Sequence, residues 1–308
     1  MAEHAPSPNS PTDPDRPHRG TIFVEDAELL SVEQWPGEQY VMRLHAPRCA
    51  AHARPGSFAH VTCDPALPMR RPLSLQRADP ASGVIEFLFK VVGEGLALLS
   101  QRRIGDRIGV LGPIGRPFAP SPGKRRPLLI GGGVGIPPMI FLAESLAAAG
   151  ATEPLVLMGS EIPFPFELGQ SERAFAGLPA AATATLPAMD TLGVTCRLSS
   201  GGGFAGCYPG FVTELAREWL RSLSPEDMAQ VEVFACGPTP MLAATARLAA
   251  EFGLPCQVSL EEYMACAVGG CAGCTVRVND PAGPAMKRVC VDGPVFDATV
   301  VDWAAIPH

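Results

Sequence analysis

The stretch Leu128-Leu-Ile-Gly-Gly-Gly-Val-Gly-Ile-Pro-Pro138 indicates the fold of the middle of the chain. Its apolar start is typical of a buried strand, its glycines of a tight loop, and its prolines of a first helical turn. Apolar runs at 155–158 and 231–235 predict further strands, and a Pro-started helix is expected over 240–251. This strand–loop–helix repetition predicts an α/β domain with a parallel sheet over residues 123–255.

The residues before this domain have a different pattern. Short β-type runs at 39–44, 58–61 and 84–91 alternate with Gly/Pro turns. Regularly spaced short strands of this kind predict a small antiparallel β-barrel, here over residues 21–122. Residues 1–20 are rich in Pro, Ser, Asp and Asn, so a disordered tail is expected there. Residues 161–206 carry no clear pattern.

Charge and hydropathy exclude two classes of partner. A net charge of −7 argues against a nucleic-acid binder, which needs a basic face. No apolar run has the length of a membrane span, and the first twenty residues lack the features of a signal peptide. We therefore expect a cytoplasmic protein with neither a nucleic-acid nor a membrane partner. In a reducing cytoplasm, clustered cysteines usually hold metal.

Four cysteines follow a known metal-binding spacing. Cys266, Cys271 and Cys274 form a C-x4-C-x2-C run, and Cys290 follows it. This is the plant-type ferredoxin pattern, in which four thiolates hold a [2Fe–2S] cluster. Glycine and alanine between the cysteines allow a tight loop whose backbone N–H groups can point at sulfur. A structural zinc site, which usually has two C-x2-C pairs, and ordinary buried cysteines are the alternatives. Residues 256–308 are predicted to form a small C-terminal [2Fe–2S] module, with Cys290 on a strand.

Two segments of the expected barrel have features of a flavin site. Arg71-Pro-Leu-Ser74 combines a fixed cation, which can grip a pyrophosphate, with a hydroxyl that can bond a flavin edge. Val92-Gly-Glu-Gly95 precedes an expected helix start, whose unpaired N–H groups suit phosphate. A surface Arg-Pro turn is the alternative for the first segment.

Two segments of the expected α/β domain suit a nucleotide. Gly131, Gly132, Gly133 and Gly135 lie between a strand and a helix, although they do not complete a G-x-G-x-x-G fingerprint. The segment Cys236-Gly237-Pro238 also ends a strand and opens a helix. The alternative for the glycine segment is a tight turn packed by glycines. The alternative for Cys236–Pro238 is a simple helix start, and each alternative explains its segment equally well.

Taken in chain order, Arg71–Ser74, the glycine loop and Cys236-Gly-Pro-Thr-Pro-Met241 resemble the ferredoxin–NADP reductase superfamily. The C-terminal residues narrow the resemblance. The cysteine block and Lys287-Arg-Val-Cys-Val-Asp-Gly-Pro-Val-Phe296 are similar to the electron-transfer subunits of class 1B dihydroorotate dehydrogenases. This similarity spans residues 21–303.

The resemblance implies bound FAD and [2Fe–2S], with NAD(H) as co-substrate. It places flavin contacts at Arg71, Pro72, Leu73, Ser74, Leu88, Phe89, Lys90, Gly95 and Leu96. Leu96 stands where the family usually has threonine, so a hydroxyl is lost there while backbone N–H donors remain. A larger departure is Ser199-Ser-Gly-Gly-Gly203, where relatives commonly carry an acidic pair. Use of NAD is therefore less firmly expected than use of FAD.

The resemblance also implies a role and a partner. Such subunits carry electrons from a dihydroorotate-oxidising FMN subunit to NAD⁺ in pyrimidine biosynthesis, and a heterotetramer is expected. No dihydroorotate site and no catalytic residue can be recognised in this chain. One alternative is an NAD(P)H-driven reductase that sends electrons outward to a ferredoxin or an oxygenase. A second is a redox sensor without enzymatic activity.

Overall fold

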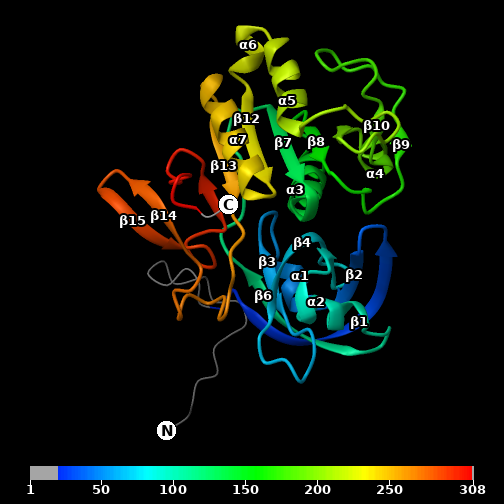
Figure 1. Cartoon of the computed structure of the whole chain (residues 1–308), viewed down its shortest axis with the longest axis vertical. Coiled ribbons are helices and arrows are strands. Elements are labelled where there is room, and N and C mark those ends of the chain that lie inside the picture. The colour runs from blue at the N-terminus through cyan, green and yellow to red at the C-terminus, as the bar shows by residue number, and fades with distance from the viewer. Residues whose placement is uncertain (1–19, 307–308) are drawn as a thin grey trace.

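The computed structural model describes residues 20–306, in which three parts lie against one another (Figure 1). A barrel at the bottom of the view is followed by an α/β domain above it, and a small Cys-containing module lies to the side. All but the last residue of the tail expected over residues 1–20 falls outside the described part of the chain.

The first part is a closed six-stranded barrel, as predicted. Its strands pair antiparallel in the order β1-β2-β5-β4-β3-β6, and closure leaves no free sheet edge. They span Phe23–Trp35 (β1), Gln39–His45 (β2), Phe58–Val61 (β3), Arg71–Asp79 (β4), Val84–Lys90 (β5) and Arg107–Ile114 (β6). Two short helices, α1 (Pro47–His52) and α2 (Gly93–Ser100), connect them. Every second side chain, such as Leu29, Phe87 and Val110, fills the barrel core.

The second part is a six-stranded sheet in the order β11-β8-β7-β12-β13-β16. The first five strands run parallel, and β16 pairs antiparallel with β13 at the edge. The strands span Arg126–Gly132 (β7), Leu155–Gly159 (β8), Thr195–Ser199 (β11), Val231–Cys236 (β12), Cys256–Ser259 (β13) and Val295–Asp297 (β16). The parallel-sheet prediction is therefore confirmed.

Helices cover both faces of this sheet, which explains why its strands are apolar throughout. Leu129 packs on one face with helix α3 (Ile136–Ala149). Leu128 and Ile130 pack on the other face, with α5 (Val212–Arg221) and α7 (Thr239–Glu251). Helix α3 ends at Gly150, which adopts the left-handed conformation (φ 66°) that favours glycine. No helix of the described residues is long and apolar enough to cross a membrane.

The third part leaves the sheet after β13 and returns to it at β16. Between these strands lie the Cys loop and a hairpin of β14 (Thr275–Asp280) and β15 (Gly283–Arg288). The boundary expected between residues 255 and 256 thus falls before the last two strands of the sheet. Residues 256–308 contribute β13 and β16 to the α/β domain as well as forming the module.

The segment 161–206, which carries no clear pattern in the sequence, holds short elements. A two-stranded sheet pairs β9 (Gly169–Gln170) with β10 (Ala184–Thr185), and helix α4 (Pro187–Thr191) leads into β11. Beyond this segment, another short helix, α6 (Pro225–Met228, four residues), precedes β12. Because such short elements bury few residues each, the hydrophobic period that reveals longer strands and helices is absent.

Candidate functional site

The four predicted cluster ligands all lie in the Cys module. Cys266, Cys271 and Cys274 lie on the loop between β13 and β14, and Cys290 lies in the turn after β15. The expectation that Cys290 belongs to a strand is wrong, because β15 ends two residues earlier at Arg288. Cys274 and Cys290 are buried, whereas Cys271 is exposed. The loop therefore has a protein-facing side and a solvent-facing side.

The sulfurs are arranged as two pairs. The backbone N–H of Cys271 donates to Sγ of Cys266 at 3.4 Å, and that of Cys290 donates to Sγ of Cys274 at 3.5 Å. The N–H of Gly273 also donates to Sγ of Cys271, at 3.4 Å. Two pairs suit a two-iron cluster, in which each iron takes two thiolates. Within residues 20–306, no three His, Cys, Asp or Glu side chains are grouped to hold a metal ion.

The backbone of the loop is bent so that its N–H groups face sulfur. Ala267 (φ 56°) and Ala272 (φ 53°) each follow a cysteine and adopt the left-handed conformation, which is uncommon for a residue with a Cβ. Gly269 (φ 79°) does the same at lower strain. Backbone outliers of this kind concentrate at ligand-binding sites, because the ligand interaction compensates for their strain.

The thiols differ in their readiness to ionise. Desolvation would raise the pKa of Cys266, but N–H groups of Val268, Cys271 and Gly270 outweigh it and lower the pKa to about 7. Burial and, after it, the neighbouring Cys274 together raise the pKa of Cys290 to about 12. Closely spaced thiolates thus oppose one another until a cationic group neutralises them. This donor set fits an iron–sulfur cluster.

The Arg71–Ser74 segment begins strand β4, with its side chains alternating as a barrel strand requires. Leu73 belongs to the barrel core, so Pro72 and Ser74 point out of the barrel. On the neighbouring strand β3, Phe58 pairs with Ser74 and points outward too. Phe58 is buried, whereas Pro72 and Ser74 are only partly buried, so the outer face of β4 is the surface available to a flavin.

Arg71 and Gly95, separated in sequence, are brought into contact. A Cβ built on Gly95 would lie 2.8 Å from Nη2 of Arg71, so only glycine allows the guanidinium to lie there. Gly95 is in the first turn of α2, where Val92 caps the helix without any side-chain hydrogen bond. Free helical N–H groups beside a guanidinium suit a pyrophosphate. The loss of the usual hydroxyl at Leu96 leaves these backbone donors in place.

The three predicted contacts on β5 have different orientations. Phe89 packs in the barrel core and stacks on Tyr40, with ring centroids 5.5 Å apart. Its side chain is therefore not on the outer face. Leu88 and Lys90 alternate with Phe89 along the strand and point outward. On this outer face Leu88 is buried, so only the side chain of Lys90 is partly exposed to a ligand outside the barrel.

The glycine loop and the Cys236–Pro238 segment meet at the carboxyl edge of the sheet. Gly131 and Gly132 end β7, and Gly133–Gly135 form a single 3-10 turn before α3. A Cβ on Gly135 would lie 2.4 Å from the backbone of Cys236 and of Gly237. Close packing therefore explains Gly135. Gly133 (φ 54°) has open space around its Cα and is the glycine most accessible to a ligand.

Two neighbouring residues restrict what this edge can do. Cys236 is fully buried, and burial raises the pKa of its thiol well above the ordinary value, so the thiol stays neutral. Ser199 ends β11 and is buried, with an Oγ that has no hydrogen-bond partner among the described residues. Ser200, also buried, accepts a hydrogen bond from the N–H of Gly202. No carboxylate occupies residues 199–203.

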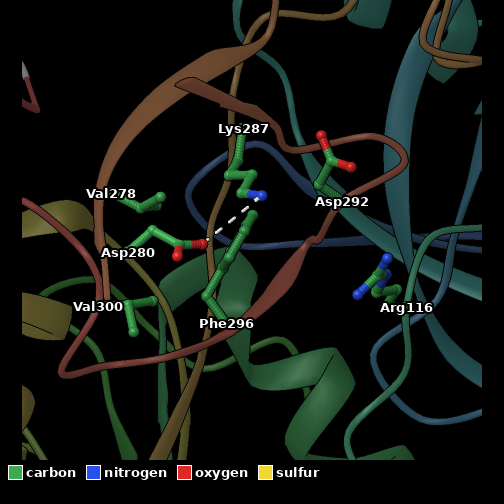
Figure 2. Close-up of a pocket in the computed structure, with 7 residues that line it drawn as sticks. All are labelled: Arg116, Val278, Asp280, Lys287, Asp292, Phe296 and Val300. Carbon is green, nitrogen blue, oxygen red and sulfur yellow. Dashed lines mark ion pairs between the residues drawn. The ribbon is translucent and has the colours of Figure 1, made fainter. Parts of the chain in front are cut away.

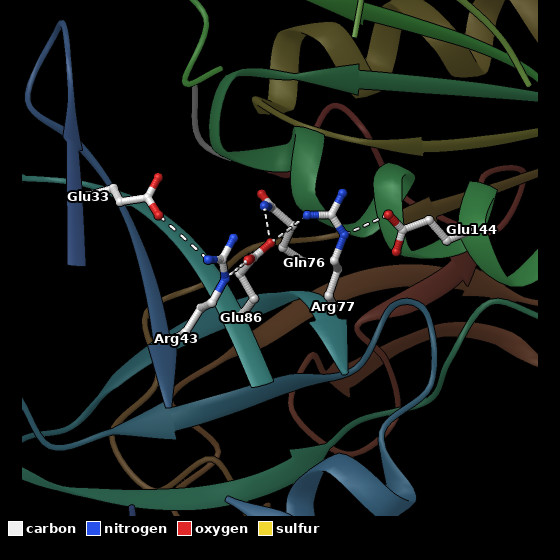
Figure 3. Close-up of polar contacts among 6 residues, drawn as sticks. All are labelled: Glu33, Arg43, Gln76, Arg77, Glu86 and Glu144. Atoms are coloured by element: carbon white, nitrogen blue, oxygen red, sulfur yellow. Dashed lines mark hydrogen bonds and ion pairs between the residues drawn. The ribbon is translucent and has the colours of Figure 1, made fainter. Parts of the chain in front are cut away.

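A polar network between the barrel and α3 has no counterpart in the sequence predictions (Figure 3). The carboxylate of Glu86, almost fully buried, accepts hydrogen bonds from Arg43, from Gln76 at 2.6 Å and from Arg77 at 2.9 Å. Arg77 also donates to Glu144 of α3 at 2.6 Å. A cavity of about 170 Å³ adjoins the network. These residues are dispersed over three strands and a helix, so no local motif could reveal them.

A second cavity, of about 150 Å³, lies between the module, strand β16 and the segment that follows β6 (Figure 2). Lys287 and Asp280 face each other across it at 3.9 Å, while Arg116 lies at its far side. Asp292 and Arg116 add one charge of each sign. Typical cofactor pockets occupy about 300–1,000 Å³. This balanced, small cavity therefore does not suit a dinucleotide.

The fold and the site together define a class of protein. A flavin-type barrel, a nucleotide-type α/β domain and a four-cysteine module characterise iron–sulfur flavoproteins of the ferredoxin reductase type. In agreement, one solved structure, described as an NADH-dependent reduced ferredoxin–NADP oxidoreductase, is similar with a TM-score of 0.72 and 28% identity over 91% of each chain. The ferredoxin reductase of carbazole 1,9a-dioxygenase shares the fold, with a TM-score of 0.57 and 22% identity over 76% of this chain and 67% of its own.

Sequence similarity identifies the family. Residues 261–302 match the iron–sulfur cluster binding domain of dihydroorotate dehydrogenase B. The electron transfer subunit of dihydroorotate dehydrogenase B (NAD⁺) from Desulforamulus reducens is 31% identical, covering 91% of this chain and 98% of the relative. That from Geobacillus thermodenitrificans is 35% identical, covering 90% and 98%. The chain belongs to the family of dihydroorotate dehydrogenase B electron transfer subunits, as its sequence predicts, and it is an oxidoreductase subunit.

Proposed function

We propose that the chain carries electrons from a dihydroorotate-oxidising FMN subunit to NAD⁺, in the cytoplasm and as part of a heterotetramer. The observation that carries this proposal is the pairing of the cluster cysteines within a domain that matches the family's own iron–sulfur domain. When bound, [2Fe–2S] supplies one-electron transfer and FAD converts between one-electron and two-electron transfer. The residues of this chain hold and orient these groups.

Each part of the chain has a defined share in the proposal. Cys266, Cys271, Cys274 and Cys290 are the proposed iron ligands. Arg71 and the first turn of α2 bind the FAD pyrophosphate, and Ser74 on the outer face of β4 bonds the flavin edge. The loop around Gly133 at the carboxyl edge of the sheet receives the nicotinamide nucleotide.

The remaining proposed cofactor contacts are Pro72, Leu73, Leu88, Lys90, Gly95 and Leu96 for FAD, with Phe89 through its main chain. For the nucleotide they are Gly131, Gly132, Gly135, Cys236, Gly237 and Pro238.

The exposed side of the cysteine loop is the proposed docking face for the FMN subunit. Tyr263 is 93% exposed and Val268 is 49% exposed, on the same loop as exposed Cys271. An aromatic and an aliphatic side chain in water beside a redox centre suit the core of an interface. Cys271, which is exposed on this side of the loop, would then face the FMN subunit.

The proposal is tested by co-expressing the chain with a dihydroorotate-oxidising FMN subunit. We expect a stable complex that reduces NAD⁺ with dihydroorotate, and iron, sulfide and FAD in a ratio of about 2:2:1 per electron-transfer chain. A chain that fails to associate but reduces ferredoxin with NADPH would contradict the proposal and support the outward reductase. A protein with zinc and no sulfide would contradict it as well.

Two substitutions test the assignment of cofactors to separate parts. Cys271→Ser should remove or destabilise the cluster and leave FAD bound, whereas Arg71→Ala should weaken FAD binding and leave the cluster. Ultraviolet–visible spectra and iron and flavin analyses of the folded variants report both. Loss of both cofactors from each folded variant would disprove the division.

A further inference from the structure

His60, on strand β3, is a buried titratable residue that no motif singles out. Its residue exposure is only 2%. Ala59 and Val61 on either side of it belong to the barrel core, so the imidazole points out of the barrel. It nevertheless remains buried, since the cysteine module covers this face of β3.

His60 lies beside the flavin strand. It pairs with Pro72 of β4 in the antiparallel register, and Phe58 pairs with Ser74. Paired residues of neighbouring strands have their side chains on the same face of the sheet. His60 is therefore the neighbour of the segment that carries the proposed flavin contacts.

The same imidazole also meets the loop that carries the cysteines. The backbone groups of Met264 and Arg70 lie close enough to the ring to raise the pKa of His60, against the larger effect of burial. Met264 precedes Cys266 by two residues, and it packs in one apolar cluster with Phe58, Ala267 and Cys290. One side chain thus touches the strand that holds the proposed flavin site and the loop that holds the proposed cluster.

The ring has hydrogen-bonding capacity left over. Nε2 of His60 is buried and has no well-formed hydrogen bond within residues 20–306. Desolvation lowers the pKa of His60, as do the charges of Arg70 and Arg71, so the imidazole is neutral near pH 7 and has one donor and one acceptor. Buried polar atoms without partners are rare in native proteins. This one faces the side of the barrel on which a flavin is expected.

We propose that His60 is a positioning residue that holds the flavin strand β4 and the cysteine loop at a fixed separation, by bonding the backbone of Met264 with one ring nitrogen and a group of the bound flavin with the other. The inference rests on the proposed function, because it requires both cofactors. It assigns His60 no proton transfer and no redox role. Its effect is to hold two cofactors at one distance, on which the rate of electron transfer between them depends.

The test compares the full chain, loaded with FAD and cluster, with three variants. His60→Leu removes both hydrogen bonds and keeps the volume, and His60→Gln retains a donor and an acceptor. His52→Leu is the matched control, since His52 lies exposed on α1, hydrogen-bonds the carbonyl of Arg48 and contacts the ring of Phe23, all away from the cysteine module. If His60→Leu does not fold, the more flexible His60→Met takes its place.

Two measurements separate positioning from stability. Laser-flash reduction of the flavin, followed optically, gives the rate at which the cluster becomes reduced without requiring NADH. Visible circular dichroism reports the surroundings of both cofactors. We expect His60→Leu to keep its FAD and iron, but to transfer electrons about tenfold more slowly, because small displacements of reacting groups have large effects on rate. His60→Gln should largely restore the rate and the dichroism, and His52→Leu should match the unmodified chain.

An apolar variant with an unchanged rate and an unchanged spectrum would overturn the inference. Equal slowing in the Leu and Gln variants would also overturn it, because hydrogen bonding would then not be the cause. An unmodified chain that binds no FAD or no cluster would instead disprove the proposed function.

Discussion

The barrel contacts the other two parts of the protein through junctions of opposite chemistry. Toward α3 of the α/β domain it presents the charged network of Glu86, Arg77 and Glu144. Toward the cysteine module it presents Phe58 and His60, which are buried. Close-packed apolar contacts are lost when surfaces shift, while a partly exposed ion pair such as Arg77–Glu144 tolerates small shifts. In the proposed function, the nucleotide would exchange at the α/β domain, which the polar junction joins to the barrel, and the cluster would stay bound in the module, which the apolar junction joins to it.

Phe58→Ala should have the largest effect, because it opens a cavity in the apolar junction. Phe58 is only 3% exposed, and truncation of a buried phenylalanine costs about 3–5 kcal/mol. Urea unfolding of the cofactor-loaded protein measures the loss. The control is Phe211→Ala, since Phe211 is 69% exposed and should change stability by less than about 0.5 kcal/mol. Equal losses in the two variants would show that the module does not depend on this contact.

Glu86→Gln tests the centre of the polar junction. The change preserves shape but removes the charge shared by Arg43 and Arg77, and we expect a loss of about 2 kcal/mol, in the range for hydrogen bonds to charged groups. Glu33→Gln is the matched control, because Glu33 is half exposed and meets Arg43 only at 3.6 Å. Chemical denaturation of both variants decides the question. If Glu33→Gln lowered the free energy of unfolding more than Glu86→Gln does, the junction would not be organised around Glu86.

The ion pair of Arg77 and Glu144, which links the barrel to α3, is expected to contribute less to stability than Glu86 does. Arg77 and Glu144 have side chains 35% and 25% exposed, so their coupling should be about 0.5–1 kcal/mol. A double-mutant cycle with Arg77→Met and Glu144→Gln measures it. The same variants should alter KM for NADH more than the electron-transfer rate between flavin and cluster. The opposite pattern would show that this junction, and not the apolar one, positions the cofactors.

The smallest expected effect is a dependence on pH. Burial lowers the pKa of His60 below its usual 6.5, so the unfolded chain binds a proton there before the folded one does. The contribution of neutral His60 to the free energy of unfolding is therefore complete above about pH 6.5. It is lost as the pH falls toward the pKa of His60 in the folded protein. Thermal unfolding at pH 7.5, 6.5 and 5.5 should show a smaller decline for His60→Gln than for the unmodified chain. Parallel declines would mean that His60 is not buried as a neutral group.

The parts of the fold with a strong local signal could be predicted from the sequence. The Leu128–Pro138 stretch and the cysteine spacing revealed a strand, a loop, a helix and a set of ligands, because each depends on residues close together in the chain. The turn position of Cys290 was missed because apolar neighbours also suit a strand. Leu88 and Phe89 could not be told apart, since the barrel face of a strand depends on register.

The contacts between parts could not be predicted in this way. Glu86, Arg77 and Glu144 lie far apart in sequence, and each alone is an ordinary surface charge. The approach of Arg71 to Gly95 depends on how β4 and α2 lie after the barrel closes. The membership of β16 in the sheet could not be predicted either, because an edge strand that returns from a later module leaves no local trace.

The return of β16 to the sheet has a consequence for biosynthesis. A ribosome delivers all four cysteines before Val295–Asp297 can pair with β13. Until then β13 has an unpaired border, which is the kind of edge on which nascent chains aggregate. A chain that stalls just after Cys290 would therefore possess every proposed cysteine ligand of the cluster and still be a target for chaperones. Iron delivered at that stage would reach a protein whose sheet is unfinished.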